Sequence, residues 1–292
     1  MREFDFLAPR SLSEALAMLA DHGGEAVVFA GGTALMLGMR QRIVSPGILV
    51  SLGGLAELRT IDFDPQRGLR IGAMARHADI ARSDEVRRHY PMLAAMAGGL
   101  ANPQVRNQGT LGGNLCYADP STDPPSCLAA FDAELVVTGA DGARRMKMQE
   151  FSADFFATAL RPGEVLTEIR LPPPHPDARA FYRRQLRTPA EHRPIANVAM
   201  TLRESGKGWS DIRIVVGAAT PVPQRMTRAE RYLEGRAVTL AEAEATAGLV
   251  ADDLAPLADG RGGADLRRRA VRAATRRLVA EAAGLDWREK AA

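Results

Sequence analysis

The chain has 292 residues, of which 46% are hydrophobic and 25% charged, so it carries enough apolar material for two ordinary cores and is not a disordered protein. It contains no run of about 18 apolar residues, and charged residues interrupt the first ten positions, so we expect a soluble cytoplasmic protein of two domains with no membrane-inserted segment or N-terminal export signal. The formal net charge is only +3, from 38 basic and 35 acidic residues, which does not support nucleic-acid binding.

A first helix is predicted over residues 12–19. Ser11 is followed three positions later by Glu14, which is the spacing of a capping box, and Leu12 begins an apolar stripe at helical spacing. The stripe stops at a Gly-Gly pair, residues 23–24, as helices commonly do. We therefore expect an amphipathic helix at the start of the chain.

Two strands follow, with a glycine turn after the first. Residues 26–30 (AVVFA) and 48–52 (ILVSL) are short continuous apolar runs, typical of strands buried on both faces. The Gly-Gly-Thr turn at 31–33 leads into a short helical segment, whose free N–H groups can face an anion. The turn matches neither G-x-G-x-x-G nor G-x-x-x-x-G-K-[ST], which disfavours the usual dinucleotide fold and the nucleoside-triphosphate loop. Taken alone, such a turn is common without a ligand.

The next stretch contains a turn, a strand and two helices. Residues 65–68 predict the turn, residues 69–73 the strand, and the charge-rich residues 77–89 a helix that we expect to face water. Pro91 then occupies the favoured first position of another helix. This helix leads into the central segment of the chain.

The central segment, residues 102–123 (NPQVRNQGTLGGNLCYADPSTD), shows neither helical nor strand periodicity. Gly109, Gly112 and Gly113 leave main-chain N–H groups open to close approach, and successive N–H groups in a turn can bind an anion. Ordinary connections run to about 4–6 residues, so this length favours a binding loop over a plain surface loop. Together with the turn at 31–33, the segment predicts a diphosphate held between two glycine segments.

A hairpin, a strand and a second domain complete the chain. Residues 133–138 and 144–148 flank an Ala-Asp-Gly turn and predict the hairpin, and residues 164–171 predict a further strand. Prolines at positions 172, 173, 174 and 176 mark the strongest domain boundary. Beyond it, a second α+β domain is predicted from strands and helices at residues 195–202, 212–218, 239–254 and 264–283.

The last predicted helix carries regularly spaced arginines. Arg268, Arg272 and Arg276 recur every four residues and share one helix face. No aromatic residue is interleaved with them, which disfavours a nucleic-acid groove. We interpret the face as solvated or as a subunit contact, although internal packing of the helix fits the same pattern.

Hydrolytic and metal chemistry have no candidate residues. The chain lacks H-E-x-x-H, G-x-S-x-G and Cys-x-x-Cys, and its five histidines are scattered without metal-ligand spacing. The two cysteines, Cys116 and Cys127, cannot hold an iron–sulfur cluster, and we expect both to be small buried apolar residues. We therefore predict no catalytic side chain and no metal ligand in this chain, so redox chemistry would require a bound cofactor.

Several stretches together resemble one family. AGGTAL at 30–35, PQVRNQGTLGGN at 103–114, D-P-x-x-D at 119–123 and RPGEVLTEIRLP at 161–172 look like the flavin subunit of the molybdenum hydroxylases. This family includes the carbon monoxide dehydrogenase medium subunit and the FAD domain of xanthine dehydrogenase. Residues 217–235 are similar to the small C-terminal domain of these flavoproteins, so the resemblance covers nearly the whole chain.

The resemblance implies a fold, a cofactor and partners. It implies an α+β fold, with an FAD-binding domain of the vanillyl-alcohol-oxidase type (PCMH type) at 1–174, built of two α+β subdomains at about 1–57 and 58–174. A small α+β domain would follow at 179–285. FAD would be bound without a covalent bond, and the chain would pass electrons from a [2Fe-2S] small subunit to an external acceptor, in an oxidoreductase whose large subunit holds molybdopterin.

The resemblance also implies a set of cofactor-binding residues. Relatives often have a cofactor-binding Lys where this chain has Arg183, and Arg184 is adjacent. Without the family, Leu100 and Leu166 would be core leucines, and Asp123 would only begin a turn. The residues implied to bind FAD are Ala30, Gly31, Gly32, Thr33, Ala34, Leu100, Thr110, Leu111, Gly112, Gly113, Asn114, Tyr117, Asp123, Leu166 and Arg183.

Two other functions compete with this interpretation. A stand-alone UDP-N-acetylenolpyruvoylglucosamine reductase would have the same FAD architecture, but the sequence lacks its serine proton-donor motif. A flavin or phosphate sensor would bind and perform no chemistry. The sequence does not specify the organic substrate of the complex, the stoichiometry of the assembly or the acceptor, for which NAD, a quinone, a cytochrome and oxygen are the candidates.

Overall fold

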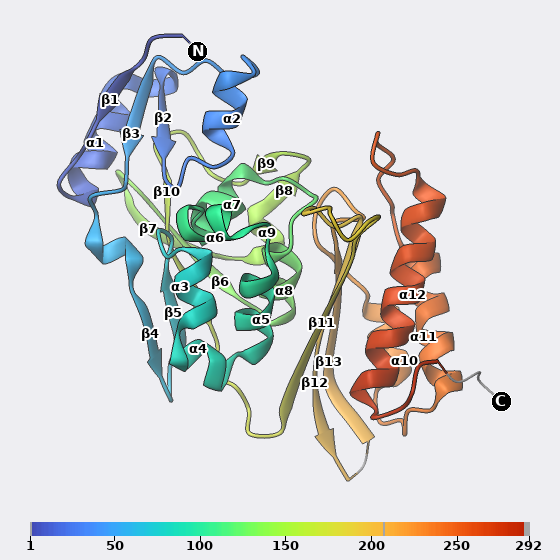
Figure 1. Ribbon diagram of the computed structural model, residues 1–292. Coiled ribbons are helices and arrows are strands. Elements are labelled where there is room, and N and C mark those ends of the chain that lie inside the picture. The colour runs from blue at the N-terminus through green and yellow to red at the C-terminus, as the bar shows by residue number, and fades with distance from the viewer. Residues whose placement is uncertain (1, 207, 289–292) are drawn as a thin grey trace.

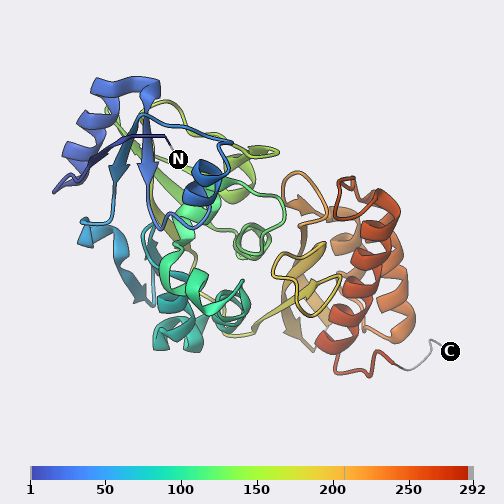
Figure 2. The ribbon, with the colours of Figure 1, turned by 45° about the horizontal axis from the view of Figure 1, so that its top comes forward.

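The computed structural model describes residues 2–206 and 208–288, which form an N-terminal part with two main β-sheets and a C-terminal part with one. Figure 1 shows the C-terminal sheet beside the N-terminal part, with its helices on the outer side, and Figure 2 shows the same arrangement from a second direction. Within the described ranges, no helix has the length and apolar character that crossing a membrane requires.

The first sheet is small and parallel. Its strand order is β1-β3-β2, with β1 (Asp5–Leu7), β2 (Ala26–Phe29) and β3 (Ile48–Ser51). The helix α1 (Leu12–His22) begins as predicted, because the Ser11 side chain accepts a hydrogen bond from the backbone N–H of Glu14 at 3.1 Å. The strand β3 is fully buried as predicted, but Val27 in β2 is 37% exposed, so β2 is not covered on both faces.

The second sheet has five antiparallel strands in the order β4-β5-β10-β6-β7. The predicted hairpin and the predicted strand near residue 165 are confirmed, and both belong to this sheet. Its strands are β4 (Ile61–Asp64), β5 (Gly68–Gly72), β6 (Glu134–Gly139), β7 (Gly142–Lys147) and β10 (Val165–Leu171). Smaller elements of the N-terminal part are the 3-10 turns Gly23–Glu25 and Ala56–Arg59, α2 (Leu35–Arg40), α9 (Met148–Phe151), β8 (Ser152–Asp154) and β9 (Ala157–Thr158).

The prediction of one water-facing helix over residues 77–89 is wrong. The chain forms α3 (His77–Arg82) and α4 (Asp84–His89), separated at Ser83, whose side chain caps α4. His77 and Ile80 are buried, because α3 packs against α5 (Pro91–Gly99). The charged residues of this stretch concealed the apolar side of each short helix.

The central segment is also more regular than the sequence suggested. It contains α6 (Pro103–Gln108) and α7 (Leu111–Tyr117), followed by α8 (Pro124–Ala130). The Asn102 side chain caps α6 at the N–H of Val105 (2.9 Å), and Thr110 caps α7 at the N–H of Gly113 (3.1 Å). Helices of two turns or less are too short to show a 3.6-residue period, which is why the pattern was missed.

The C-terminal part is an antiparallel sheet covered by helices on one face. Its strands are β11 (Ala178–Gln185), β12 (Ala196–Ser205), β13 (Gly208–Gly217) and β14 (Gln224–Arg225). The helices are α10 (Thr227–Leu233), α11 (Leu240–Asp253) and α12 (Ala264–Ala282). Along β12, Val198 and Met200 join the core under these helices, whereas Ala199 joins the core of the N-terminal part, so alternate residues of one strand serve two cores.

The arginine face of α12 contacts α11. Arg272 and Arg276 pair with Glu244, and the Nε of Arg268 donates to the carbonyl of Ala251 at 3.1 Å. Internal packing therefore contributes to this face, which also remains solvated, since the Arg268 and Arg272 side chains are 41% and 56% exposed. The adjacent Arg267 is fully buried and donates to backbone carbonyls, so it is a structural residue that the pattern did not reveal.

Candidate functional site

A cavity of about 340 Å³ lies where the two N-terminal sheets meet the central segment. Its walls come from β2 and the turn after it, from the end of β5, from α7 and from β10. The lining is mostly apolar with a few polar groups, which is the usual character of a small-molecule site.

The two glycine segments touch each other at this cavity. A Cβ atom on Gly31 would lie 2.3 Å from the carbonyl oxygen of Gln108 and 2.9 Å from the Cα of Gly109. Gly32 has φ +67°, and its Cβ would lie 2.7 Å from the Phe29 ring. Glycine at position 31 therefore lets the two backbones approach this closely, and glycine at position 32 permits the positive φ and the contact with the Phe29 ring.

The second glycine segment is fastened to the five-stranded sheet. The N–H of Gly112 donates to the carbonyl of Ala73 at 2.8 Å, and its Cβ would lie 2.6 Å from the Cβ of Ala73. The N–H groups of Gly109 and Gly113 are also bonded, to the carbonyl of Val105 and to the hydroxyl of Thr110. The expectation that these three glycines leave open N–H donors is therefore wrong, because they serve close packing and a helix cap.

The first glycine segment does present open donors. The backbone N–H groups of Gly32, Thr33 and Ala34 make no hydrogen bond within residues 2–206 and 208–288, and all three residues line the cavity. Consecutive N–H groups of this kind form a concavity suited to an anion. Residues 32–34 thus offer three adjacent donors to an anion, and the second segment packs against the neighbouring Gly31.

Most of the residues implied to bind FAD line this cavity. Asn114 does so while exchanging side-chain hydrogen bonds with Thr122 (2.9 and 3.1 Å), and Tyr117 is 40% exposed at the cavity wall. Three of the implied residues, Leu111, Asp123 and Arg183, do not line it. Those that do are Ala30, Gly31, Gly32, Thr33, Ala34, Leu100, Thr110, Gly112, Gly113, Asn114, Tyr117 and Leu166.

The implied residues outside the lining are buried or paired elsewhere. Leu111 is 1% exposed in the core. Asp123 is 2% exposed, accepts a hydrogen bond from the Tyr182 hydroxyl and lies 3.6 Å from the Arg184 guanidinium. Burial raises the pKa of Asp123, against the opposing effects of Arg184 and Tyr182. Asp123 thus links α8 to β11 rather than facing the cavity.

The adjacent arginines of β11 point to different partners. Arg183 pairs with Glu281 of α12, on the helix side of the C-terminal sheet. Arg184 donates to the carbonyls of Gly99 (2.5 Å) and His192 (2.6 Å), and Gly99 precedes the cavity residue Leu100. Arg184 is therefore the arginine nearer the cavity, because successive residues of a strand point to opposite faces.

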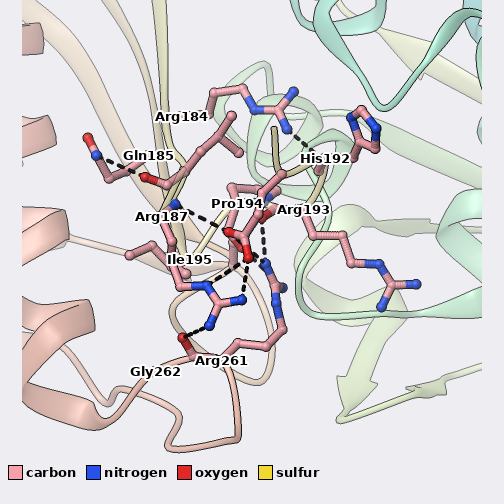
Figure 3. A network of polar contacts seen from close by, with 12 residues as sticks. Arg184, Gln185, Arg187, His192, Arg193, Pro194, Ile195, Arg261 and Gly262 are labelled. Carbon is pink, nitrogen blue, oxygen red and sulfur yellow. Dashed lines mark hydrogen bonds and ion pairs between the residues drawn. The ribbon is translucent and has the colours of Figure 1, made fainter. Parts of the chain in front are cut away.

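The loop between β11 and β12 is held by an arginine network, which Figure 3 shows gathered around Arg187 and Arg261. Arg187 donates to Glu191 at 2.7 Å and to the carbonyl of Arg261 at 3.1 Å. Arg193 reaches the central segment and pairs with Asp119 at 3.0 Å. The network ties the C-terminal part to the segment that forms one cavity wall, and sequence spacing did not reveal it.

Two further polar residues of the cavity were missed. His77 is 2% exposed, and burial lowers its pKa to about 4. Glu164 accepts hydrogen bonds from the Arg144 side chain and from the backbone N–H of Arg161. These bonds, chiefly the one from Arg144, lower the pKa of Glu164 to about 2. Only their positions in the sequence could have identified these two residues, because His77 follows a predicted strand and Glu164 begins one.

The prediction for the two cysteines is confirmed for one of them. Cys127 is buried as expected, whereas Cys116 is exposed at the cavity.

Comparison with known proteins gives matches over nearly the whole chain. Residues 2–174 match the family described as "FAD binding domain in molybdopterin dehydrogenase", and residues 180–282 match "CO dehydrogenase flavoprotein C-terminal domain". The carbon monoxide dehydrogenase medium chain of Hydrogenophaga pseudoflava is 33% identical over 90% of this chain and 91% of its own length. The 6-hydroxypseudooxynicotine dehydrogenase complex subunit alpha of Paenarthrobacter nicotinovorans is 31% identical, with coverage of 96% and 94%.

A solved structure agrees with these relatives. Carbon monoxide dehydrogenase from Hydrogenophaga pseudoflava, in a form lacking the Mo-pyranopterin moiety of the molybdenum cofactor, superimposes with a TM-score of 0.91 at 32% identity. The superposition covers 95% of this chain and 96% of that one. The mixed helix and strand architecture, an FAD-binding domain followed by a C-terminal domain, is therefore common to both.

Proposed function

The chain belongs to the family of FAD-binding domains in molybdopterin dehydrogenases, and on that premise we propose that it is the FAD-containing electron-transfer subunit of a heteromeric molybdenum hydroxylase. It is an oxidoreductase subunit and a flavoprotein by this membership. The proposal adds its place in the assembly, in which electrons arrive from an iron–sulfur subunit and leave to an external acceptor.

The observation that carries the proposal is the set of open donors at Gly32, Thr33 and Ala34. All three residues line the cavity, and the neighbouring Gly31 packs so closely against Gln108 and Gly109 that a single Cβ there would displace them. An anionic group against three N–H donors suits the diphosphate of FAD. The residues present therefore fit the cofactor that the family implies.

The proposal also covers the domain boundaries and the residues that contact FAD. We assign residues 1–174 to a PCMH-type FAD-binding domain, with subdomains at about 1–57 and 58–174, and residues 179–285 to the C-terminal domain. Residues 30–34 would hold the diphosphate through their open N–H groups, and the cavity-lining residues of 110–114 would pack beside it. Leu100, Tyr117 and Leu166 would supply apolar contacts. Asp123 and Arg184 would act indirectly, by fixing Gly99 and Leu100 against the C-terminal sheet. FAD, when bound, supplies the redox chemistry, and the protein supplies binding and orientation.

Partners are required to complete a catalytic cycle. The relatives are named as a medium chain and as a subunit of a dehydrogenase complex, and one matched structure is described as a Cu,Mo-CO dehydrogenase. Among the described residues, no group of three or more His, Cys, Asp and Glu side chains could hold a metal ion. We infer a molybdopterin-binding large subunit and a [2Fe-2S] small subunit, and favour this assembly over a stand-alone reductase or a sensor.

The first experiment tests cofactor binding. The purified chain should be yellow, and heat or acid should release FAD, because no covalent attachment is expected. FAD at about 100 times its dissociation constant should stabilise the folded chain by about 2.7 kcal/mol. A melting temperature that does not change with saturating FAD would contradict binding, and flavin retained by the precipitated protein would contradict noncovalent attachment.

The second experiment tests the assembly. Affinity capture from the native cells should recover two further subunits, one containing molybdenum and one containing iron. Oxidation of the organic substrate should appear only when all three are combined. Complete turnover of that substrate by the isolated 292-residue chain would overturn the proposed role.

A further inference from the structure

His77 is a buried cavity residue whose side chain has no hydrogen-bond partner. It is 2% exposed, its Nδ1 is buried without a partner, and no hydrogen bond joins the ring to another side chain or to the backbone within the described ranges. Burial lowers the pKa of the ring to about 4, so near pH 7 it is neutral and carries one N–H donor and one acceptor nitrogen. Buried polar side chains are normally paired, so this ring calls for a partner that the chain itself does not provide.

The position of His77 indicates what that partner is. Its backbone N–H donates to the carbonyl of Gly109 at 3.1 Å, which fixes the start of α3 to the second glycine segment. A Cβ on Gly109 would lie 3.4 Å from the Cδ2 of His77 and 3.4 Å from the hydroxyl oxygen of Thr33. The ring therefore lies against Gly109, on the side of that glycine that also meets the Thr33 hydroxyl, and it lines the same cavity as residues 32–34.

We propose that the neutral His77 ring donates a hydrogen bond to an oxygen of the FAD diphosphate and is a positioning residue for the cofactor. Phosphate oxygens are acceptors, so the ring N–H is the group that fits them. The inference rests on the proposed FAD-binding function, and it extends the site from backbone donors to a side chain that neither spacing nor motif suggested. A neutral donor suits a buried position, because it avoids the cost of burying a charge before the ligand binds.

The test compares three variants with three ligands. His77→Leu removes the donor, His77→Gln restores one at similar reach, and His22→Leu is a control at an exposed histidine. The apoprotein is titrated with FAD, with ADP as a diphosphate probe, and with riboflavin, which has no phosphate. We expect His77→Leu to weaken FAD and ADP binding about 10-fold each, as loss of a hydrogen bond to a charged group does, and to leave riboflavin unchanged.

The outcomes separate the inference from its premise. Recovery of most of the FAD and ADP affinity in His77→Gln supports the hydrogen bond. If His77 has a purely structural role, His77→Leu will weaken the binding of riboflavin and ADP together, and that result would overturn the inference. Affinities for FAD within twofold of wild type in His77→Leu would overturn it as well. Failure of the wild-type chain to bind FAD would instead overturn the proposed function.

A second measurement does not depend on the variants folding. In nitrogen NMR of the wild-type chain labelled at histidine, the His77 ring resonances should change when ADP is added. These resonances are assigned by elimination among the other histidines, or by their absence in His77→Gln. The His22 resonances should stay constant. Unchanged His77 ring nitrogens at saturating ADP would refute the contact.

Discussion

Replacing Gly31 by Ala tests whether the close approach of the two glycine segments creates the cofactor site. The added Cβ would lie 2.3 Å from the carbonyl oxygen of Gln108, whereas ordinary contact begins near 3.4 Å, so the two backbones must separate by about 1 Å. The obstruction is main chain, so no side-chain rotation relieves it. A shift of about 1 Å takes an N–H···O distance of about 2.9 Å beyond hydrogen-bonding range.

The expected loss follows from that displacement. Losing one charge-assisted hydrogen bond costs about 1.5–3 kcal/mol, so Gly31→Ala should weaken FAD binding by roughly 10-fold to 100-fold. Overpacking should also lower the unfolding free energy of the apoprotein by about 1–3 kcal/mol. Titration of the apoprotein with FAD, followed by flavin fluorescence, measures the first quantity, and urea unfolding measures the second.

Gly24→Ala is the matched control for this substitution. A Cβ at Gly24 meets no atom within 4 Å, so the same chemical change should leave FAD affinity within about twofold of wild type. A dissociation constant for Gly31→Ala equal to that of Gly24→Ala would show that the approach of the two segments does not support FAD binding, and the reasoning above would fail.

Three further predictions concern the supports of the cavity. Thr110→Val removes the cap of α7 and should destabilise the chain by about 1 kcal/mol in urea unfolding, whereas Thr110→Ser should behave as wild type. Because the pKa of Glu164 is lowered to about 2, its pairing with Arg144 contributes stability that is fully present above about pH 4.5 and is lost as the pH falls through 2. If the unfolding free energy of Glu164→Gln falls with pH as steeply as that of wild type in an acid titration, this prediction is wrong. Tyr182→Phe deprives the buried Asp123 carboxylate of its hydroxyl donor and should cost about 1–3 kcal/mol, and an unchanged urea midpoint would show that this bond contributes nothing.

Elements with long periodic patterns or clear boundary signals were predictable from the sequence. The helix α1, the strand β3 and the β6–β7 hairpin form where capping, apolar runs and turn residues indicate. The helices α6 and α7 were not predictable, because helices of six and seven residues carry too few positions to show a period and are stabilised mainly by capping and packing. The strand β11 was also missed, since its ARAFYRRQ sequence has arginines on both faces and no run of large apolar residues.

The candidate site shows a similar division. Glycine pairs and family motifs identified residues 30–34 and 110–114, all of which except Leu111 line one cavity, and whether each of them contacts FAD stays a prediction. The sequence did not reveal that the N–H groups of the three glycines in the second segment are bonded, whereas those of residues 32–34 are open within the described ranges. Hydrogen bonding of the glycines at 109, 112 and 113 depends on where Val105, Ala73 and Thr110 lie.

The sequence by itself determined the position of α1, β3 and the β6–β7 hairpin, the presence of two glycine segments and the family of the chain, because turn chemistry and motif spacing are local properties. Tertiary structure alone decided which groups remain unpaired. Asp123 faces Tyr182 and Arg184, which follow it by about 60 residues, and His77 is left without a partner between two segments that are distant in the chain. Burial and hydrogen bonding of a polar group depend on neighbours supplied by the whole fold, so no local pattern can specify them.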